Sequence, residues 1–312
     1  MNINAGEIEN KGIELALMLT PVVTKNFKWD VKINWSKNNN KVLSLIQGVD
    51  NLQLGSFQGN VTLNARVGQP YGVLLGTDYT YTDGGQKIIS ASNGKPVKTA
   101  TADHVIGNVT PDWNGGFQST MTYKNWSFSF LIDMQKGGDI YSLDMYYGLS
   151  SGLYAETAGN NELGNPLRNP IVYNNPAVGF SSGYASTTGG YLNEGVNVSS
   201  TGDITPNKKR VSATTYSGFG YGAEPNKAFI YDAGYIKLRE ISISYSLPAK
   251  LLKGAFIQGL TLSAVASNPW IISKSLPYAD PESGLGSGNV QGYSIGSLPS
   301  TRDFGFNVKL NF

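Results

Sequence analysis

The stretch GGFQSTMTYKNWSFSFLIDMQKGG, residues Gly115–Gly138, decides the fold of this chain. It consists of two runs of alternating side chains that meet at Lys124-Asn125. The face with the large apolar side chains takes Phe117, Ser119, Met121, Tyr123, Trp126, Phe128, Phe130, Ile132 and Met134. The opposite face is polar except for Leu131. A period of two predicts strands with one apolar and one polar face, and a two-residue polar connection predicts a β-hairpin.

Such a hairpin suits two environments. In a soluble β-sandwich, the apolar face packs against a second sheet. In an outer-membrane barrel, it faces lipid, the polar face lines a wet lumen, and aromatic residues gather near the headgroups. The second arm has about nine alternating residues, and a tilted strand needs ~9–11 to cross a bilayer. The hairpin alone leaves both interpretations open.

Other segments repeat the pattern. Phe27–Lys37 alternates strictly, and Trp29 and Trp35 lie toward opposite ends of its apolar face, which is typical of aromatic residues at membrane interfaces. Two more segments alternate in the same way, Ile13–Leu19 and Arg302–Phe312, and Leu260–Asn268 is predicted to be another strand. The residues expected at a membrane interface are Trp29, Trp35, Tyr123, Trp126 and Phe312.

Phe229–Leu247 shows the same alternation with a change of phase. Ile236 and Leu238 fall on even positions, whereas the later apolar residues fall on odd ones. One extra residue near Arg239-Glu240, a β-bulge, restores a common face. The segment is therefore predicted to be one strand with a bulge.

The connections between these segments alternate in length. The short ones are 20–26, 124–125 and 248–258, the last with one helical turn at 250–252. The long ones are 38–115, 139–228 and 269–302, rich in Gly, Asn, Ser and Tyr and without a sustained period. Strict alternation is typical of a barrel with tight periplasmic turns and large external loops, so the long connections are expected outside the cell.

Composition narrows the class of protein further. Charged residues make up 15% of the 312 residues, below the usual ~25%. The net charge of +2 gives no support for a nucleic-acid partner, and the absence of cysteine excludes disulfides and Cys-ligated metal. The sequence contains no run of 18 apolar residues, so no transmembrane helix is predicted. Strands of a membrane barrel would not give such a run, because half of their residues are polar. The first residues lack a secretory signal, so the chain either is not exported or lacks its true beginning.

Nine stretches, in this order, resemble the C-terminal barrel portion of the SusC/RagA family of TonB-linked outer-membrane proteins. They are NAGEIENKGIEL (Asn4–Leu15), VGQPYG (Val67–Gly72), IGNVTPDWNGGF (Ile106–Phe117), YKNWSFSF (Tyr123–Phe130), QKGGDIYS (Gln135–Ser142), YIKLREISISYSLP (Tyr235–Pro248), SNPW (Ser267–Trp270), DPESG (Asp280–Gly284) and the terminal strand. Each is loose alone, but their order along nearly the whole chain is specific.

The resemblance implies an all-β fold: residues 1–312 form the C-terminal part of a roughly 22-stranded, plugged, antiparallel transmembrane barrel. The plug, the N-terminal strands and the signal peptide are then expected to be missing. It also implies an outer-membrane importer of glycans or peptides, with a SusD-like surface lipoprotein, the TonB complex and outer-membrane lipid as partners. The alternative is a soluble or surface-attached sandwich that binds glycans without transport. An enzyme is disfavoured and no cofactor is expected.

Few residues suggest chemistry. His104, the only histidine, supplies neither a catalytic triad nor a zinc set, and is expected on a loop surface. Asp280 and Glu282 are expected to form a turn, with calcium as the lesser reading. Tyrosines are the other candidates, because those in the longest connection can stack on sugars, contact a partner or simply pack the loop. They are Tyr146, Tyr147, Tyr154, Tyr173, Tyr184 and Tyr191, with Tyr216 and Tyr221 in the same connection.

Overall fold

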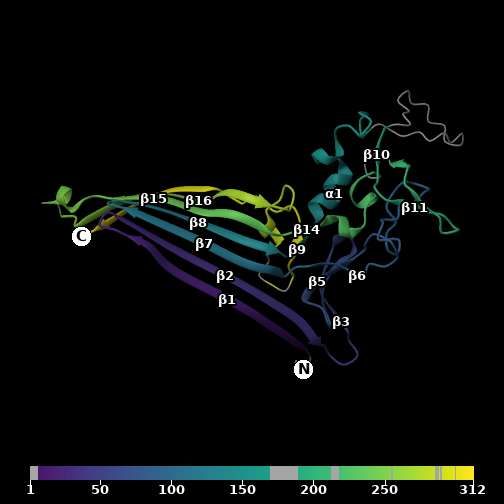
Figure 1. The fold of residues 1–312 in the computed structure, drawn as a ribbon, viewed down its shortest axis with the longest axis horizontal. Helices are drawn as coiled ribbons and strands as arrows, with labels where there is room; N and C mark the ends of the chain where they lie inside the picture. Colours follow the sequence, from purple (N-terminus) through teal and green to yellow (C-terminus); the bar gives the residue numbers. More distant parts are fainter. Residues whose placement is uncertain are drawn as a thin grey trace.

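Seven strands form one long antiparallel sheet in the order β1-β2-β7-β8-β15-β16-β18. Their bounds are β1 Glu7–Val23, β2 Phe27–Ser44, β7 Pro111–Tyr123, β8 Trp126–Gly137, β15 Tyr235–Ser246, β16 Gly259–Lys274 and β18 Asp303–Asn311. The computed structural model describes residues 6–168, 189–211, 218–253, 256–284, 288, 290–298 and 300–312. Figure 1 shows this seven-stranded sheet, here called the wall, as long and twisted. Because β1 and β18 are its two outer strands, the sheet is open.

The predicted hairpin and the predicted bulge are both confirmed, but Phe229–Leu247 is not one strand, because Ile230–Asp232 forms a separate strand that pairs with Asp139–Ser142. Tyr123 pairs with Trp126 across the turn, where Lys124 adopts a positive φ of 52°. On both sides of β15 the register shifts between Leu238 and Glu240.

One face of the sheet is apolar across all seven strands. A single row of paired residues shows this, with Ser119, which accepts a hydrogen bond from Trp29 Nε1, as its one polar member: Leu19, Val31, Ser119, Phe130, Ile241, Ala266 and Phe304. The next row faces the other way: Met18, Lys32, Gln118, Leu131, Glu240, Ser267 and Asp303. The apolar face is uncovered, with Ile243 47% and Phe306 90% exposed. Within the described residues no second sheet packs on it, as a sandwich requires.

The predicted alternation of short and long connections is confirmed. The short connections and the C-terminus lie at one end of the sheet, and the long connections lie at the other (Figure 1). Some strands are longer than predicted. β1 continues past Pro21 to Val23, with a register shift between Leu19 and Val22, so the turn covers only residues 24–26. The predicted helical turn appears as the 3₁₀ helix η5, Ala249–Leu252.

The long connections, which show no sustained period in the sequence, contain regular structure. The first holds a four-stranded sheet: β3 Asn51–Phe57, β4 Val61–Arg66, β5 Tyr71–Gly76 and β6 His104–Asn108, with η1 Gln58–Asn60. β5 is buried on both faces, so its side chains form a short continuous apolar run that periodicity does not reveal.

The second and third long connections are also structured. The second holds β9 Asp139–Ser142, α1 Leu143–Ser151, η2 Ala155–Thr157, β10 Tyr191–Leu192, β11 Val196–Val198, β12 Ile204–Pro206, β13 Arg210–Val211, η3 Gly220–Gly222, η4 Asn226–Phe229 and β14 Ile230–Asp232. The third holds η6 Pro281–Gly284 and β17 Tyr293–Ser294, and β17 joins β9 and β14 in one small sheet. No helix in the described part of the chain is both long and apolar enough to cross a membrane.

Candidate functional site

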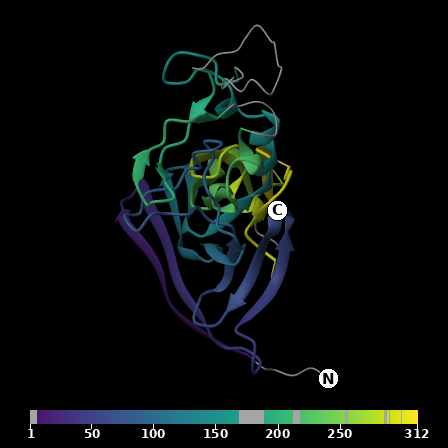
Figure 2. The ribbon, with the colours of Figure 1, turned by 90° about the vertical axis from the view of Figure 1, so that its right-hand side faces the viewer.

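The three long connections fold into one body, here called the loop assembly (Figures 1 and 2). Its core consists of buried side chains from the first two connections: Phe57, Val61, Leu63, Leu74, Ile106, Tyr141, Leu143, Met145 and Phe229. The third connection joins them through Tyr293, whose ring stacks on Phe57 at 4.3 Å between centroids. Segments far apart in sequence therefore share one core.

Helix α1 is placed by its ends and by its buried side. Ser142 is its N-cap and accepts a hydrogen bond from the Met145 backbone N–H at 3.2 Å. Gly152 ends it with a φ of 74°, a conformation that favours glycine. Leu143 and Met145 lie in the core, whereas Tyr147 is 44% exposed.

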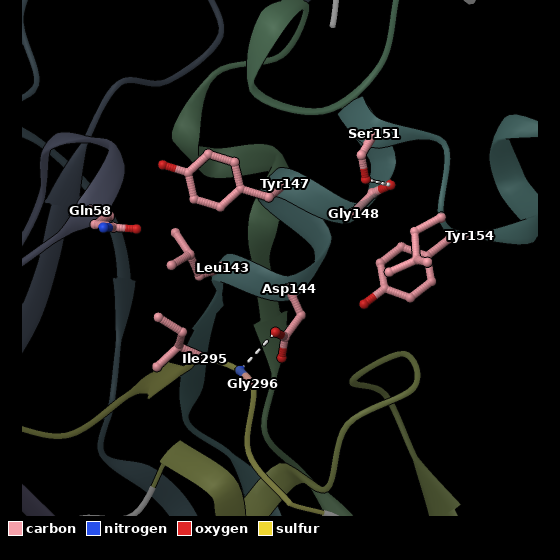
Figure 3. A pocket seen from close by; sticks show the side chains of 10 residues that line it. Gln58, Leu143, Asp144, Tyr147, Gly148, Ser151, Tyr154, Ile295 and Gly296 are labelled. Carbon is pink, nitrogen blue, oxygen red and sulfur yellow. Dashed lines mark hydrogen bonds between the residues drawn. The ribbon is translucent and has the colours of Figure 1, made fainter. Parts of the chain in front are cut away.

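A pocket of about 420 Å³ opens beside α1 (Figure 3). It is lined by Gln58, Leu143, Asp144, Tyr147, Gly148, Ser151, Leu153, Tyr154, Ile295 and Gly296, which come from all three long connections. The Asp144 carboxylate accepts a hydrogen bond from the Gly296 backbone N–H at 2.8 Å, which ties the third connection to the helix. Apolar and aromatic walls with few polar groups are typical of sites for small ligands.

The predicted tyrosines divide into three groups. Tyr147 and Tyr154 line the pocket, and Tyr154 stacks on Tyr278 at 4.4 Å. Tyr146 packs against Phe229 in the assembly, and Tyr191 stacks on Phe219 away from the pocket. Two more of the six, Tyr173 and Tyr184, lie outside the described residues. A role for any of them in binding remains a prediction.

The pocket tyrosine beside Asp144 keeps its proton. Burial, and then the Asp144 carboxylate, raise the pKa of Tyr154 above its usual value. Its phenol is therefore a hydrogen-bond donor at neutral pH, next to a carboxylate that accepts. Sequence reasoning missed Asp144, Gln58 and Ile295 because no motif marks them; only the fold brings them together.

A second group of polar residues, here called the inner-face cluster, joins the loop assembly to the wall. Lys237 of β15 is 3% exposed, and its Nζ lies 2.5 Å from Asp280 Oδ1 and 2.5 Å from Glu282 Oε2. Arg239 pairs with Asp133 of β8 at 2.7 Å and also with Glu282.

The cluster confirms the predicted turn at the DPESG motif. Ser283 N–H donates to the Asp280 carbonyl at 2.9 Å, and Glu282 N–H donates to Asp280 Oδ1 at 3.0 Å. Burial raises the pKa of both carboxyls, but hydrogen bonds from Lys237 to Asp280 and from Arg239 and Lys237 to Glu282 outweigh it and hold each pKa below its usual value. Lys237 and Arg239 already neutralise the carboxylates that a calcium site at Asp280 and Glu282 would need. The described residues contain no group of three or more His, Cys, Asp or Glu able to hold a metal.

The remaining predicted residues are on the surface. His104 begins β6 rather than lying in a loop, with its side chain 46% exposed and Nε2 3.8 Å from Asp103. Tyr123, Trp126 and Phe312 are exposed.

The tryptophans of β2 lie on the same apolar face of the sheet as Tyr123 and Trp126. Trp29 pairs with Met121 and Trp35 with Gly115, and both tryptophans are half-buried. Sequence reasoning missed Tyr245, whose ring lies 4.7 Å from that of Trp126, and Trp270, which is exposed. Contact of these aromatic residues with a membrane remains a prediction.

A third polar group surrounds Glu224 within the loop assembly. Tyr79 donates a hydrogen bond from its hydroxyl to Glu224 Oε2 at 2.9 Å, and Lys87 Nζ lies 4.1 Å from the Tyr79 ring centroid. Burial raises the pKa of Glu224, although Tyr79 and the neighbouring lysines act in the opposite direction.

Comparisons with known proteins agree with this architecture. No family model matches the chain. The chain is 27% identical over 333 residues to "TonB-dependent receptor P26" of Formosa agariphila, covering 99% of this chain and 30% of that protein. It is 26% identical over 295 residues to "TonB-dependent receptor SusC" of Bacteroides thetaiotaomicron, covering 88% and 24%. The RagAB peptide transporter structure matches with a TM-score of 0.63 at 18% identity, over 99% of this chain and 30% of that one.

The chain resembles TonB-dependent receptors of the SusC/RagA type. The SusC/RagA-like chain spans less than a third of the length of each of these relatives. The likeness to RagAB shows the fold, so the open seven-stranded sheet corresponds to part of a barrel wall.

Proposed function

We propose that the SusC/RagA-like chain is part of an outer-membrane transporter that imports a nutrient, with residues 1–312 as the C-terminal part of its barrel. The observation that carries the proposal is the sheet with one uncovered apolar face and every long connection at one end. Lipid satisfies such a face across seven strands. The names of the relatives, receptors and a transporter, support import.

The loop assembly is the recognition end of this transporter. Its pocket combines the rings of Tyr147 and Tyr154 with the carboxylate of Asp144. Rings stack on sugars as well as on side chains, and the RagAB neighbour is titled a peptide importer. The substrate is accordingly a glycan or a peptide. A SusD-like surface lipoprotein covers this end, and energy comes from the TonB complex through other parts of the full-length protein.

Orientation in the membrane gives the first test. In the full-length protein, Ser200→Cys places a thiol on an exposed turn between β11 and β12. Lys25→Cys places one on an exposed short turn between β1 and β2. A membrane-impermeant maleimide should label the first variant on intact cells and the second only after the outer membrane is opened. Labelling in the reverse order contradicts the proposed topology, and absence from the outer-membrane fraction contradicts the proposed function.

The pocket gives the second test. Tyr147→Ala should weaken binding of the imported substrate about tenfold, because an aromatic contact contributes about 0.5–1.5 kcal/mol beyond the area that it buries. Tyr191→Ala is the matched control, since Tyr191 stacks on Phe219 away from the pocket. Equal losses for the two variants, measured by substrate uptake and by titration calorimetry, contradict this location of the site.

A further inference from the structure

The short-turn end of the sheet is basic. The short connections, residues 24–26, 124–125 and 247–258, contain Lys25, Lys124, Lys250 and Lys253 and no acidic residue. The long connections, residues 45–110, 138–234 and 275–302, carry fourteen acidic and ten basic residues. The two ends of the wall thus have opposite charge, and the excess of positive charge lies at the end proposed to face the periplasm.

Large apolar side chains stand exposed beside these lysines. Leu251 of η5 is 71% exposed and Phe256, later in the same connection, is 84% exposed. The ring of Phe256 lies 5.3 Å from that of the C-terminal Phe312. Exposed apolar groups next to lysines are typical of segments that lie in the headgroup region of a membrane.

An apolar trough runs along the outer face toward the same end. Ala264 and Ala266 of β16 are small, whereas bulky residues of β15 and β18 form ridges on either side. Two cavities of about 290 and 430 Å³ share Ile243, Ala264 and Phe306, so they form one continuous trough.

The trough ends close to the lysines. Its last lining residues are Trp126 and Tyr245, whose rings are in contact. Asn125 binds the end of β15, because its Nδ2 donates to the Ser246 carbonyl at 2.7 Å and its own carbonyl accepts from the Ser246 N–H at 2.9 Å. Lys124 precedes Asn125, and η5 begins three residues after Ser246.

We propose that the trough and the basic short-turn end, here called the rim (Lys25, Lys124, Lys250 and Lys253), bind an anionic phospholipid. One acyl chain lies in the trough, the glycerol region lies at Trp126 and Tyr245, and the phosphate pairs with Lys124, Lys250 and Lys253. The proposal rests on the proposed function, because it needs the apolar face to be in a bilayer. Charge complementarity selects the occupant: hydrocarbon walls accept a chain, and only an anionic headgroup matches a rim with four lysines and no acid.

The position of the rim also selects the source of the lipid. At the short-turn end the chain meets the leaflet opposite to the loop assembly. A glycerophospholipid of the periplasmic leaflet therefore fits, whereas a lipopolysaccharide of the outer leaflet would meet the long connections.

Native mass spectrometry of the full-length protein in detergent tests the site, with dioleoylphosphatidylglycerol and dioleoylphosphatidylcholine as probes. The wild type should bind phosphatidylglycerol more tightly. Lys250→Gln with Lys253→Gln should weaken phosphatidylglycerol about thirty-fold and leave phosphatidylcholine unchanged, since each basic residue near an anionic surface contributes about 1 kcal/mol. Ala264→Phe should fill the trough and weaken both lipids.

The matched control is Lys41→Gln with Lys208→Gln, which removes two exposed lysines away from the rim and should change nothing. Equal binding of the two lipids by the wild type overturns the headgroup site, and so does a preference that survives in the Lys250 and Lys253 variant. Tight lipopolysaccharide binding that the same variant abolishes overturns the choice of leaflet. Fractionation of the same cells tests the proposed function separately. A protein that is in the outer membrane but binds both lipids equally refutes only the lipid site. A protein that is absent from the outer membrane refutes both proposals.

Discussion

Removal of Lys237 should release the third long connection from the wall. The side chain of Lys237 is 4% exposed and that of Asp280 is 10% exposed, so their ion pair is almost completely shielded from water. In Lys237→Met, Glu282 keeps Arg239 as a partner, but the buried Asp280 carboxylate loses its ion pair and keeps only the more distant Lys274 as a cation. Leaving one member of a buried pair unpaired costs about 3–5 kcal/mol.

Hydrogen exchange of residues 275–302 in the full-length protein measures this loss. A change of 3–5 kcal/mol corresponds to a fall in protection of roughly two to three and a half orders of magnitude. The double variant Lys237→Met with Asp280→Asn should recover most of the protection, because it also removes the stranded charge. A fall of less than about tenfold in the single variant, or a double variant no better than the single one, refutes the reasoning.

The pH dependence of the same protection supplies an independent check. The folded pKa values of Asp280 and Glu282 lie below their ordinary values of 3.8 and 4.5. Their contribution to stability is therefore fully present above those ordinary values and is lost as the pH falls through the folded ones. Protection of residues 275–302, corrected for intrinsic exchange, should be constant from pH 6 to 8 and should fall below about pH 4.

Three further predictions test the wall and the loop assembly. Phe128→Arg should reduce the stability of the assembled protein by ~2–4 kcal/mol at the bilayer midplane, whereas Ser129→Arg on the inner face should reduce it far less. Equal losses of heat-resistant barrel in the two variants contradict the assignment of Phe128 to the lipid-facing side. Because burial raises the pKa of Glu224, its contribution to stability is present below the ordinary value and is lost as the pH rises through the folded one. Exchange of residues 218–224 should therefore quicken over that range in the wild type but not in Glu224→Gln, and a dependence that persists in the variant assigns it elsewhere. Deletion of Arg239 should preserve assembly and loosen residues 275–302, whereas deletion of Leu238 should impair assembly. If deletion of Arg239 impairs assembly and deletion of Leu238 does not, the bulge does not determine which side chains of β15 lie on the apolar face.

The strands of the wall could be predicted because their apolar and polar side chains alternate with a period of two. Each strand has one uncovered apolar face, so alternation survives intact in the sequence, and even the bulge at Arg239 appears as a change of phase. The hairpin at Lys124-Asn125 needs only local pairing. Strand ends were less predictable, since β1 continues through Pro21 on an outer edge of the sheet, where a missing N–H costs no partner.

The loop assembly could not be predicted in the same way. Its strands are short and are stabilised by contacts across the chain, such as the stacking of Phe57 on Tyr293. The pocket joins Gln58, Asp144 and Ile295, which no spacing relates. Tyrosine content alone pointed to the right connection, but it did not separate Tyr147, which lines the pocket, from Tyr146, which packs the core.

The bulge in β15 links the membrane requirement to the recognition end. Lys237, Arg239 and Glu240 are charged, and strict alternation would turn either Arg239 or Glu240 toward the apolar face. A charge there would cost up to ~2–4 kcal/mol, depending on its depth. With one extra residue, Glu240 pairs on the inner side while Ile241 returns to the apolar row, and Arg239 reaches Asp133 and Glu282. The bulge that keeps charge out of the apolar face therefore also turns Arg239 toward Glu282 of the third long connection. The wall itself thus helps to position the loop assembly.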